Sequence, residues 1–268
     1  KREGPSAMTY LYFHLVFILP VLLAVYFLRR MQKPARIPGR WAGVATLCLI
    51  ALIYTTPWDN YLVAAKIWDY GKGRIIESLL IGYVPIEEYF FFVLQPLMTG
   101  SFLLFYADRT PGIVERLAAP LRRDTPAWIG SGFWVVGFIL GVICLVSLSS
   151  HYKYLGLILV WACPVLAFQW AYGGETLWTM RDLLWPAVRT STVYLWVVDY
   201  IAIEWRIWYI LPETSTGWKL ITLPVEEAVF FLLTNLMVVQ GLLLFYQVTC
   251  RWMRKKCKAT SSQILGEN

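Results

Sequence analysis

The chain has few charged residues and few histidines. It also lacks several short motifs of histidine, cysteine or glycine that are common in soluble enzymes. Only 15% of its 268 residues are charged and only two are histidines, whereas a soluble domain carries about a quarter charged residues. The sequence has no HExxH pair, no CxxC pair among its five cysteines and no GxGxxG turn. These absences argue against a histidine-based metal site, a Cys-ligated zinc site and a dinucleotide-binding domain.

Long apolar runs take the place of these motifs. Hydrophobic residues make up 58% of the chain, and several runs approach or exceed the roughly 20 residues that cross a bilayer as a helix. We therefore expect an all-α integral protein of the cell membrane with seven transmembrane helices. The expected spans are about 10–28, 41 to at least 57, 77–106, 128–148, 154–170, 190–210 and 220–249.

Basic residues mark one side of the expected bundle. Sixteen of the 24 Lys and Arg lie in segments 29–40, 107–127, 171–189 and 250–268. The side richer in Lys and Arg faces the cytoplasm, so we expect the N-terminus outside and the C-terminus inside. Because the charge is confined to a few loops and the tail, the net charge of +7 predicts no nucleic-acid partner. Residues 1–7, KREGPSA, resemble an expression remnant and are set aside.

The two parts of the chain repeat one another. Asp59 and Trp68 align with Asp199 and Trp208, 140 residues later, and VPIEEYFFF aligns with LPVEEAVFF after 139 residues. We expect four parts: a first three-helix repeat at 8–106, a linker with a connecting helix at 107–150, a second three-helix repeat at 151–249 and a basic cytoplasmic tail at 250–268. A single connecting helix makes the repeats parallel in the membrane, so both Glu-Glu pairs can converge on one cavity.

Acidic residues within the apolar runs are the main candidates for chemistry. A charge near the bilayer centre costs at least about 2.5–3.5 kcal/mol. If the second helix continues to about residue 70 and the third begins near residue 77, these acids meet in one layer, roughly 15 Å from the turn. Burial and mutual repulsion favour protonation of several of them, which places acids beside bases. The candidates are Asp59, Glu87, Glu88, Asp199, Glu226 and Glu227.

A second interpretation of the same acids stays open. Pro85 and Pro224 could occupy the first turn of helices that begin there. The glutamates would then lie near the interface, favoured by the helix dipole and purely structural. The aromatic residues around the acids could stabilise a cation, or they could serve packing and the interface. These aromatic residues are Trp58, Tyr61, Tyr83, Phe91, Trp196, Tyr200 and Phe230.

Three stretches, YTTPWDNYL, GYVPIEEYFFF and LPVEEAVFF, resemble the membrane-embedded lycopene β-cyclase family. That family occurs as two small subunits in some bacteria, as one fused chain in archaea and as the cyclase part of fungal bifunctional enzymes. The resemblance covers nearly the whole chain, from Met8 to about Tyr246. In the second half VVDY replaces PWDN, which allows a functional asymmetry between the halves.

The resemblance implies cyclisation of the linear ψ ends of lycopene to β-ionone rings, giving γ-carotene and then β-carotene without net redox change. A protonated acid, with Glu87 or Glu226 favoured, would protonate the terminal double bond. The neighbouring double bond would then close the ring on the cation. A carboxylate (Glu88, Glu227 or an aspartate) would remove a proton. The seven aromatic residues named above are the candidates for binding the substrate.

Several alternatives stay open from the sequence. A carotenoid hydratase would use the same acids but admit water, a proton-coupled transporter would relay protons, and a scaffold would only bind carotenoid or lipid. No cofactor or metal pattern is visible, although a bound lipid or a reduced flavin in a non-redox role would leave none. The expected partners are lycopene, its carotenoid intermediates and membrane lipid. Association with other carotenoid-pathway enzymes, the oligomeric state and the number of active sites stay open as well.

Overall fold

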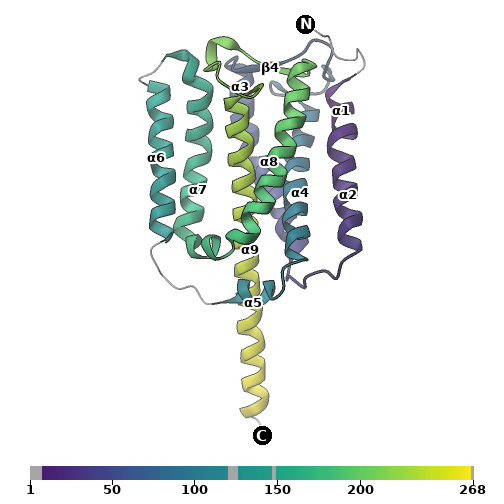
Figure 1. The fold of residues 1–268 in the computed structure, drawn as a ribbon, viewed down its shortest axis with the longest axis vertical. Helices are drawn as coiled ribbons and strands as arrows, with labels where there is room; N and C mark the ends of the chain where they lie inside the picture. Colours follow the sequence, from purple (N-terminus) through teal and green to yellow (C-terminus); the bar gives the residue numbers. More distant parts are fainter. Residues whose placement is uncertain (1–7, 120–125, 147–148, 267–268) are drawn as a thin grey trace.

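The computed structural model is a bundle of long helices with short strands at one end, and the two termini lie at opposite ends of it (Figure 1). It describes residues 8–119, 126–146 and 149–266. The suspected remnant at residues 1–7 lies outside the described residues.

Six helices of the described chain are long and apolar enough to cross a membrane. They are a composite first helix made of α1 (Tyr10–Phe13), the π-helix η1 (His14–Ile18) and α2 (Leu19–Arg30), followed by α3 (Arg40–Ala64), α4 (Ile86–Ala107), α6 (Pro126–Val146), α7 (Lys153–Thr179) and α9 (Val225–Gly266). The expected helical membrane class is confirmed. Helix α8 (Arg181–Glu204) runs beside them but carries five charged residues and is not among the six, so the seventh span stays a prediction.

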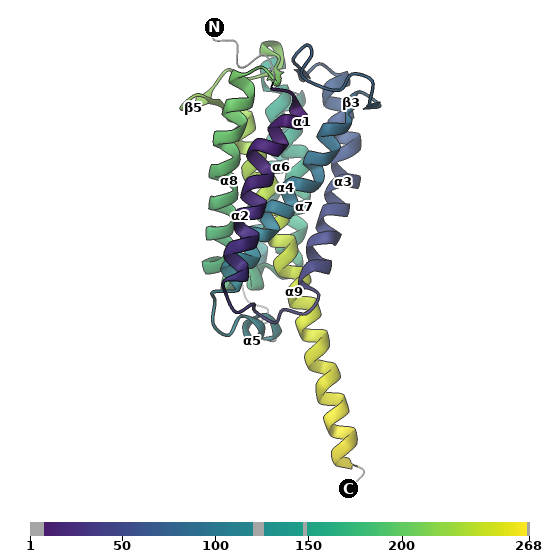
Figure 2. The same ribbon diagram turned by 90° about the vertical axis from the view of Figure 1, so that its right-hand side faces the viewer.

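Short antiparallel strands cover one end of the bundle, which we call the strand end (Figure 2). Strand β2 (Leu80–Ile81) forms a hairpin with β3 (Val84–Pro85), and β5 (Lys219–Leu220) forms one with β6 (Leu223–Pro224). Strand β1 (Trp68–Tyr70) pairs with β4 (Trp208–Ile210) and so joins two distant loops. The remaining elements are α5 (Ile113–Ala118) and the short 3-10 turns η2 (Ser150–Tyr152) and η3 (Pro212–Thr214).

Helix ends next to the strand end differ from the expected ones. Helix α3 ends at Ala64 instead of continuing to about residue 70, because Lys66 takes a left-handed conformation with φ of 54° that stops the helix. Helix α4 begins at Ile86 instead of near residue 77, because Pro85 is extended and belongs to the hairpin. The strands therefore occupy the segment where the sequence suggested additional helical turns.

The second half shows the same shifts. Helix α8 covers 181–204 instead of 190–210, and the left-handed conformation of Arg206, with φ of 52°, stops the helix there. Helix α7 continues to Thr179 across a kink at Gly173, where a loop was expected. Helix α9 begins at Val225 and continues to Gly266, so the expected tail is helical up to that residue.

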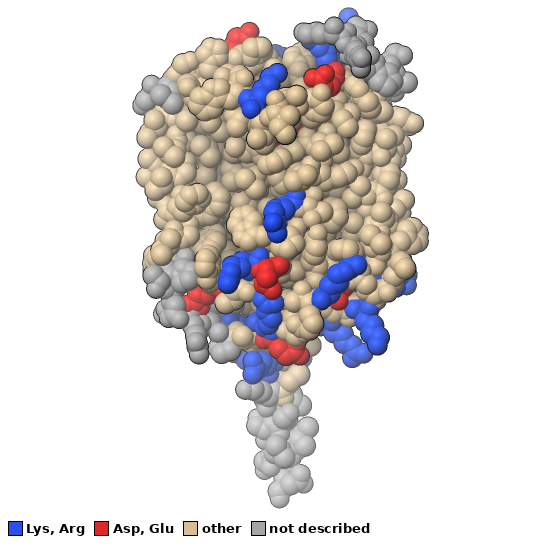
Figure 3. All heavy atoms as spheres, viewed as in Figure 1, with Lys and Arg blue, Asp and Glu red and all other residues tan. Residues whose placement is uncertain are grey.

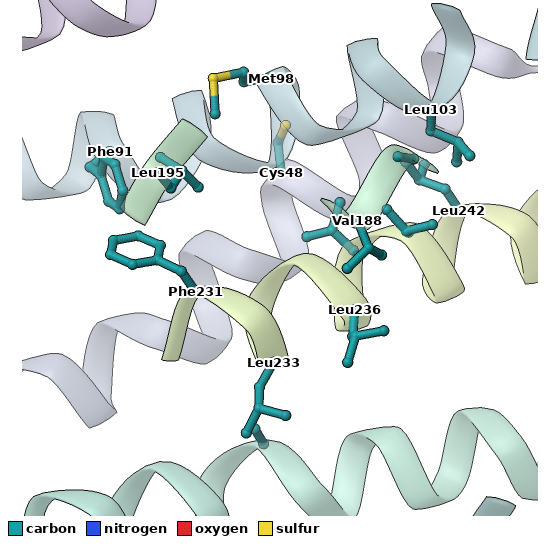
Figure 4. Packing of buried hydrophobic residues seen from close by; sticks show 14 of the residues in the cluster. Cys48, Phe91, Met98, Leu103, Val188, Leu195, Phe231, Leu233, Leu236 and Leu242 are labelled. Carbon is teal, nitrogen blue, oxygen red and sulfur yellow. The ribbon is translucent and has the colours of Figure 1, made fainter. Parts of the chain in front are cut away.

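The core lies around α4 and α9. In each of them 67% of the most apolar segment is buried, against 6% in α6, which therefore lies at the periphery beside α7. Figure 4 shows the interdigitated apolar side chains, among them Met98 of α4, Leu195 of α8 and Leu236 of α9. The core also holds polar contacts, since Gln95 of α4 donates to the Asn235 amide oxygen of α9 at 2.7 Å.

Candidate active site at the strand end

All six acidic candidates are buried at the strand end, each with 7% exposure or less. The two glutamate pairs occupy the first turns of α4 and α9, and Asp59 and Asp199 lie five residues before the ends of α3 and α8. The helices thus begin where the second interpretation of the sequence put them. The acids are nevertheless enclosed, because strands and loops cover these helix ends.

Four of the six acids line one cavity between α3, α4, α7, α8 and α9. Asp59, Glu88, Asp199 and Glu227 each come from a different helix, and the empty space, including its mouth, is about 690 Å³. Among the described residues that line it, none is Lys, Arg or His. Most of the other lining side chains are aromatic: Tyr10, Trp58, Trp68, Phe91, Phe92, Tyr154, Trp161, Trp208, Phe230 and Phe231.

The two cavity glutamates receive hydrogen bonds from tyrosines. The Tyr70 hydroxyl donates to Glu88 Oε2 at 3.3 Å, and the Tyr154 hydroxyl donates to Glu227 Oε1 at 2.8 Å. Tyr10 lines the same cavity as Glu88. Donors of this kind stabilise the carboxylate form, so both glutamates are suited to accept a proton.

The two aspartates are less well provided with donors. The Trp208 indole N–H donates to Asp199 Oδ1 at 2.8 Å. The Oδ2 atoms of Asp59 and Asp199 are buried and have no hydrogen-bond partner among the described residues. A buried carboxylate oxygen without a hydrogen-bond donor is costly. Protonation removes the negative charge and so favours the neutral form of these two aspartates. Both aspartates also lie close enough to Glu88 and Glu227 to interact with their charges.

Glu87 and Glu226 point away from the cavity and bind the covering loops. Glu87 Oε1 accepts the backbone N–H of Ile76 at 2.9 Å. Glu226 Oε1 accepts the Thr216 N–H at 2.6 Å and the Thr216 hydroxyl at 2.7 Å. Neither residue lines the cavity. The sequence favoured these two as proton donors, but the structure places the second glutamate of each pair, not the first, in the cavity.

The seven aromatic candidates divide in the same way. Trp58, Phe91 and Phe230 line the cavity, and Figure 4 shows Phe91 of α4 opposite Phe231 of α9, with ring centroids 6.2 Å apart. The other four are not lining residues. Tyr61 and Tyr83 are exposed, Tyr200 is half-buried, and the Trp196 indole donates to the Ala228 carbonyl.

Sequence reasoning missed Tyr10, Tyr70, Tyr154 and Trp161. One signal was available, because the PVL stretches at 20–22 and 164–166 set an offset of 144 residues that also aligns Tyr10 with Tyr154. Tyr70 aligns with Ile210 and had no such signal. In the described parts of the chain no three His, Cys, Asp or Glu side chains converge closely enough to hold a metal ion. The arrangement is suited to proton transfer in an apolar, aromatic cavity.

Three known proteins that this chain resembles are described as lycopene cyclases or as bifunctional enzymes that contain one. The family described as lycopene cyclase matches residues 8–106 and 129–245. A lycopene beta-cyclase of Halobacterium salinarum is 39% identical over 254 residues, covering 91% of this chain and 98% of that protein. A bifunctional lycopene cyclase/phytoene synthase of Arthroderma gypseum is 32% identical over 88% of this chain and 41% of its own length. The bifunctional lycopene cyclase/phytoene synthase of Aspergillus niger is 38% identical over 74% of this chain and 34% of its own length. No solved structure matches the chain.

Proposed function

The chain belongs to the lycopene cyclase family, and we propose that the cavity shared by Asp59, Glu88, Asp199 and Glu227 is where it cyclises lycopene. It is an enzyme of the intramolecular lyase type, which converts the linear ψ ends of lycopene to β-ionone rings. Ring closure at one end gives γ-carotene, and closure at the other gives β-carotene. The observation that carries the assignment to this cavity is the convergence of four acids from four helices on one aromatic pocket.

The reaction needs one proton delivered and one removed at each end. A proton adds to the terminal double bond and leaves a tertiary cation. The next double bond attacks this cation, so a carbon–carbon bond closes the six-membered ring and the positive charge moves into the ring. Loss of a ring proton then sets the β double bond. Substrate and product have the same atoms and the same oxidation level, so general acid and general base groups suffice for the protein's part.

The hydrogen bonds divide the acids into two roles. Among the four cavity acids, Asp59 and Asp199 are the proton donors. Each has a buried oxygen without a donor, a feature that Glu87 and Glu226 share outside the cavity. Mutual repulsion in a medium of low dielectric keeps all four cavity acids from ionising together. Glu88 and Glu227 are the bases, because tyrosine hydroxyls stabilise their carboxylates. Pairing a neutral acid with a charged base in one site is a known way to run both steps at one pH.

The aromatic wall serves the cationic intermediate. Faces of Trp, Tyr and Phe attract a cation within about 6 Å of the ring, and rings from Trp58, Phe91 and Phe230 line the cavity. Exclusion of water prevents capture of the cation as an alcohol. The identity of the product therefore distinguishes a cyclase, which forms a ring, from a hydratase, which uses the same acids but forms an alcohol.

The finer architecture belongs to the same proposal. We take α8 as a seventh span and divide the chain into parallel three-helix repeats at 8–106 and 151–249, joined by 107–150. Pseudo-symmetric contacts support this: the Gly71 N–H donates to the Ile207 carbonyl and the Leu211 N–H donates to the Ile67 carbonyl, both at 2.9 Å. Each residue of one contact is 140 positions from its counterpart in the other.

Surface charge supports the orientation. On the face seen in Figure 3, Lys and Arg gather mainly toward the end of the bundle where the C-terminal helix leaves it. With the positive side cytoplasmic, the N-terminus and the strand end lie outside, and the tail after residue 249 lies inside. The exposed apolar side chains of α6, such as Ile129, Phe133 and Val136, contact membrane lipid in this arrangement.

The test compares neighbouring glutamates and both aspartates in cells that accumulate lycopene. We expect Asp59→Asn, Asp199→Asn, Glu88→Gln and Glu227→Gln to lower the cyclisation rate by roughly 100-fold or more, so the cells stay red. The matched controls Glu87→Gln and Glu226→Gln should keep most activity, because an amide oxygen still accepts the loop N–H groups. Activity is measured as γ- and β-carotene formed per amount of folded protein.

Three outcomes would change the proposal. Loss of activity in Glu87→Gln and Glu226→Gln with retention in the cavity variants would return the proton-donor role to the first glutamates. A product heavier by one water would identify a hydratase. A wild-type protein that is folded and leaves lycopene unchanged would contradict the cyclase function itself and favour a transporter or a carotenoid-binding scaffold.

A further inference from the structure

The cavity extends beyond the acids, away from the strand end. Ala51, Thr55 and Trp58 of α3 and Trp161 of α7 line this extension, together with Gln95 of α4 and Thr234 of α9. Helix α3 packs on α4 and α9, but across the described residues its backbone makes little contact with α7. The wall between α3 and α7 is therefore made by side chains and not by packed backbones.

Four aromatic rings are stacked along this wall. The rings of Trp58 and Trp161 lie 4.5 Å apart at 18°, and Trp58 and Phe230 lie 5.8 Å apart at 8°. Tyr54 stacks on Trp161 at 5.4 Å and 20°, and its hydroxyl donates to the Trp161 carbonyl at 2.9 Å. These rings stack on one another, so the faces and edges that the stack leaves uncovered are what another planar π-system can contact. The buried indole nitrogens of Trp58 and Trp161 also have no acceptor among the described residues.

The equivalent contact in the other half has different neighbours. There Tyr194 donates to the Phe17 carbonyl, which repeats the contact of Tyr54 with Trp161. Trp58, however, is replaced by Val198, and Phe17 meets its aromatic neighbours Phe13 and Trp205 at tilted angles of 46° and 51°. Neither Tyr194, Val198 nor Phe17 lines the cavity. The two halves thus share the tyrosine–carbonyl contact, but among the described residues only the contact between α3 and α7 includes a residue, Trp161, that lines the cavity.

We propose that lycopene reaches the acids through a crevice between α3 and α7, with its polyene tail packed against the Trp58–Trp161 stack and projecting into the membrane. This inference rests on the proposed function. Lycopene is a rigid, extended polyene, and the empty space of about 690 Å³ already includes the open mouth of the cavity, so we expect the cavity to enclose only one end at a time. The remainder must leave by an apolar route that opens to lipid, and the stacked rings supply an aromatic surface along that route.

The single route has a consequence for the order of the reaction. After the first ring closes, the monocyclic intermediate must withdraw through the same crevice before its linear end can be inserted. The enzyme therefore processes the two ends in separate binding events, and γ-carotene exchanges with the lipid phase between them.

The experiment narrows the crevice and compares the result with a lipid-facing control. Ala51 lines the extension, whereas its neighbour Ile50 is 52% exposed. We expect Ala51→Trp to lower kcat/KM for lycopene in vesicles by roughly tenfold or more, while Ile50→Trp leaves it unchanged. Trp161→Ala should raise KM by up to roughly tenfold with little change in kcat, because it removes aromatic contact with the tail. Phe17→Ala, at the position equivalent to Trp161 in the other half, should leave KM unchanged.

Folding and chemistry are separated from access by a second substrate. A truncated polyene with the same terminal group, short enough to fit the cavity, should still be cyclised by Ala51→Trp at the wild-type rate. Wild-type kcat/KM for lycopene in a folded Ala51→Trp protein would overturn the inference, as would a larger effect of Phe17→Ala than of Trp161→Ala. Loss of both substrates in Ala51→Trp would also overturn it, since the defect would then lie at the acids. A wild-type protein inactive on lycopene would instead contradict the proposed function.

Discussion

At the scale of single residues, adjacent glutamates have different surroundings. Neighbouring positions on a helix point about 100° apart, so in each pair one side chain faces the cavity and the other faces the covering loop. Glu88 and Glu227 meet tyrosine hydroxyls in the cavity, whereas Glu87 and Glu226 bind backbone N–H groups. The Glu-Glu motif therefore combines a reactive group with the anchor of the loop that covers it.

The anchoring role predicts a stability effect at Glu226. Glu226→Ala leaves the Thr216 N–H and hydroxyl without their acceptor, so we expect the free energy of unfolding to fall by about 1–3 kcal/mol. Glu226→Gln retains an acceptor oxygen and should lose much less. Thermal unfolding in detergent measures the difference, and equal melting temperatures for the two variants would contradict the anchoring role.

The tyrosine donors predict an effect on rate. Tyr154→Phe removes the hydroxyl bonded to Glu227 at 2.8 Å, and Tyr70→Phe removes the hydroxyl that donates to Glu88 at 3.3 Å. We expect kcat to fall roughly tenfold in each variant, because a hydrogen bond to a charged group contributes about 1.5–3 kcal/mol. KM should change little, since the hydroxyl positions the base and not the tail. A change in KM alone would show that the tyrosines only shape the binding site.

At the scale of elements, the β1–β4 pair joins the loops of the two halves above the cavity. Its register places Trp68 opposite Ile210 and Tyr70 opposite Trp208, and Trp208 donates to Asp199. The strand pair thus positions both a cavity wall and a donor to one of the acids. Gly71, directly after β1, allows the close approach of the two loops.

This close approach predicts the result of a small substitution. A Cβ at position 71 would lie 1.9 Å from the Arg206 carbonyl oxygen, so Gly71→Ala must displace the backbone of one loop. We expect lower thermal stability and reduced cyclisation. Gly132→Ala in α6 is the control, because no atom lies within 4 Å of the added Cβ and alanine favours a helix by about 0.5–1 kcal/mol over glycine. If both variants behaved like the wild type, the strand pair would not be needed for the site.

At the scale of the whole molecule, the cavity belongs to both halves. Asp59 and Glu88 come from the first half, and Asp199 and Glu227 from the second. Because α4 and α9 form the centre of the bundle, neither half can close the cavity alone.

Because both halves contribute acids to the cavity, we expect two separately produced halves to restore activity when combined. A chain divided after residue 148 should cyclise lycopene only when both parts are produced together, and each part alone should be inactive. Carrying Glu88→Gln in the first part should abolish the restored activity even with an intact second part. Cyclisation by either part alone would show two independent sites and contradict a single shared cavity. Pigment extracted from lycopene-accumulating cells gives the measurement.

The sequence by itself determined the helical membrane class, the family and the set of buried acids. Apolar runs of sufficient length leave few alternatives to transmembrane helices, and the two Pro-x-Glu-Glu stretches with their aspartates mark where charge is kept despite its cost. All six acids are buried, as the sequence indicated. The start of α4 after Pro85 was also accessible from local rules for proline, although the longer helix was favoured.

Only the tertiary structure decided which acids share the cavity and on which side the cavity continues. The direction of Glu88 against Glu87 depends on where α4 begins and on what the covering loop offers, namely the Ile76 N–H. The donors Tyr70 and Trp208 reach the acids through the β1–β4 pairing, a contact between segments 140 residues apart. Local periodicity carries no information on such contacts, because they depend on how distant elements pack. The same reason explains why the route between α3 and α7 became apparent only in three dimensions.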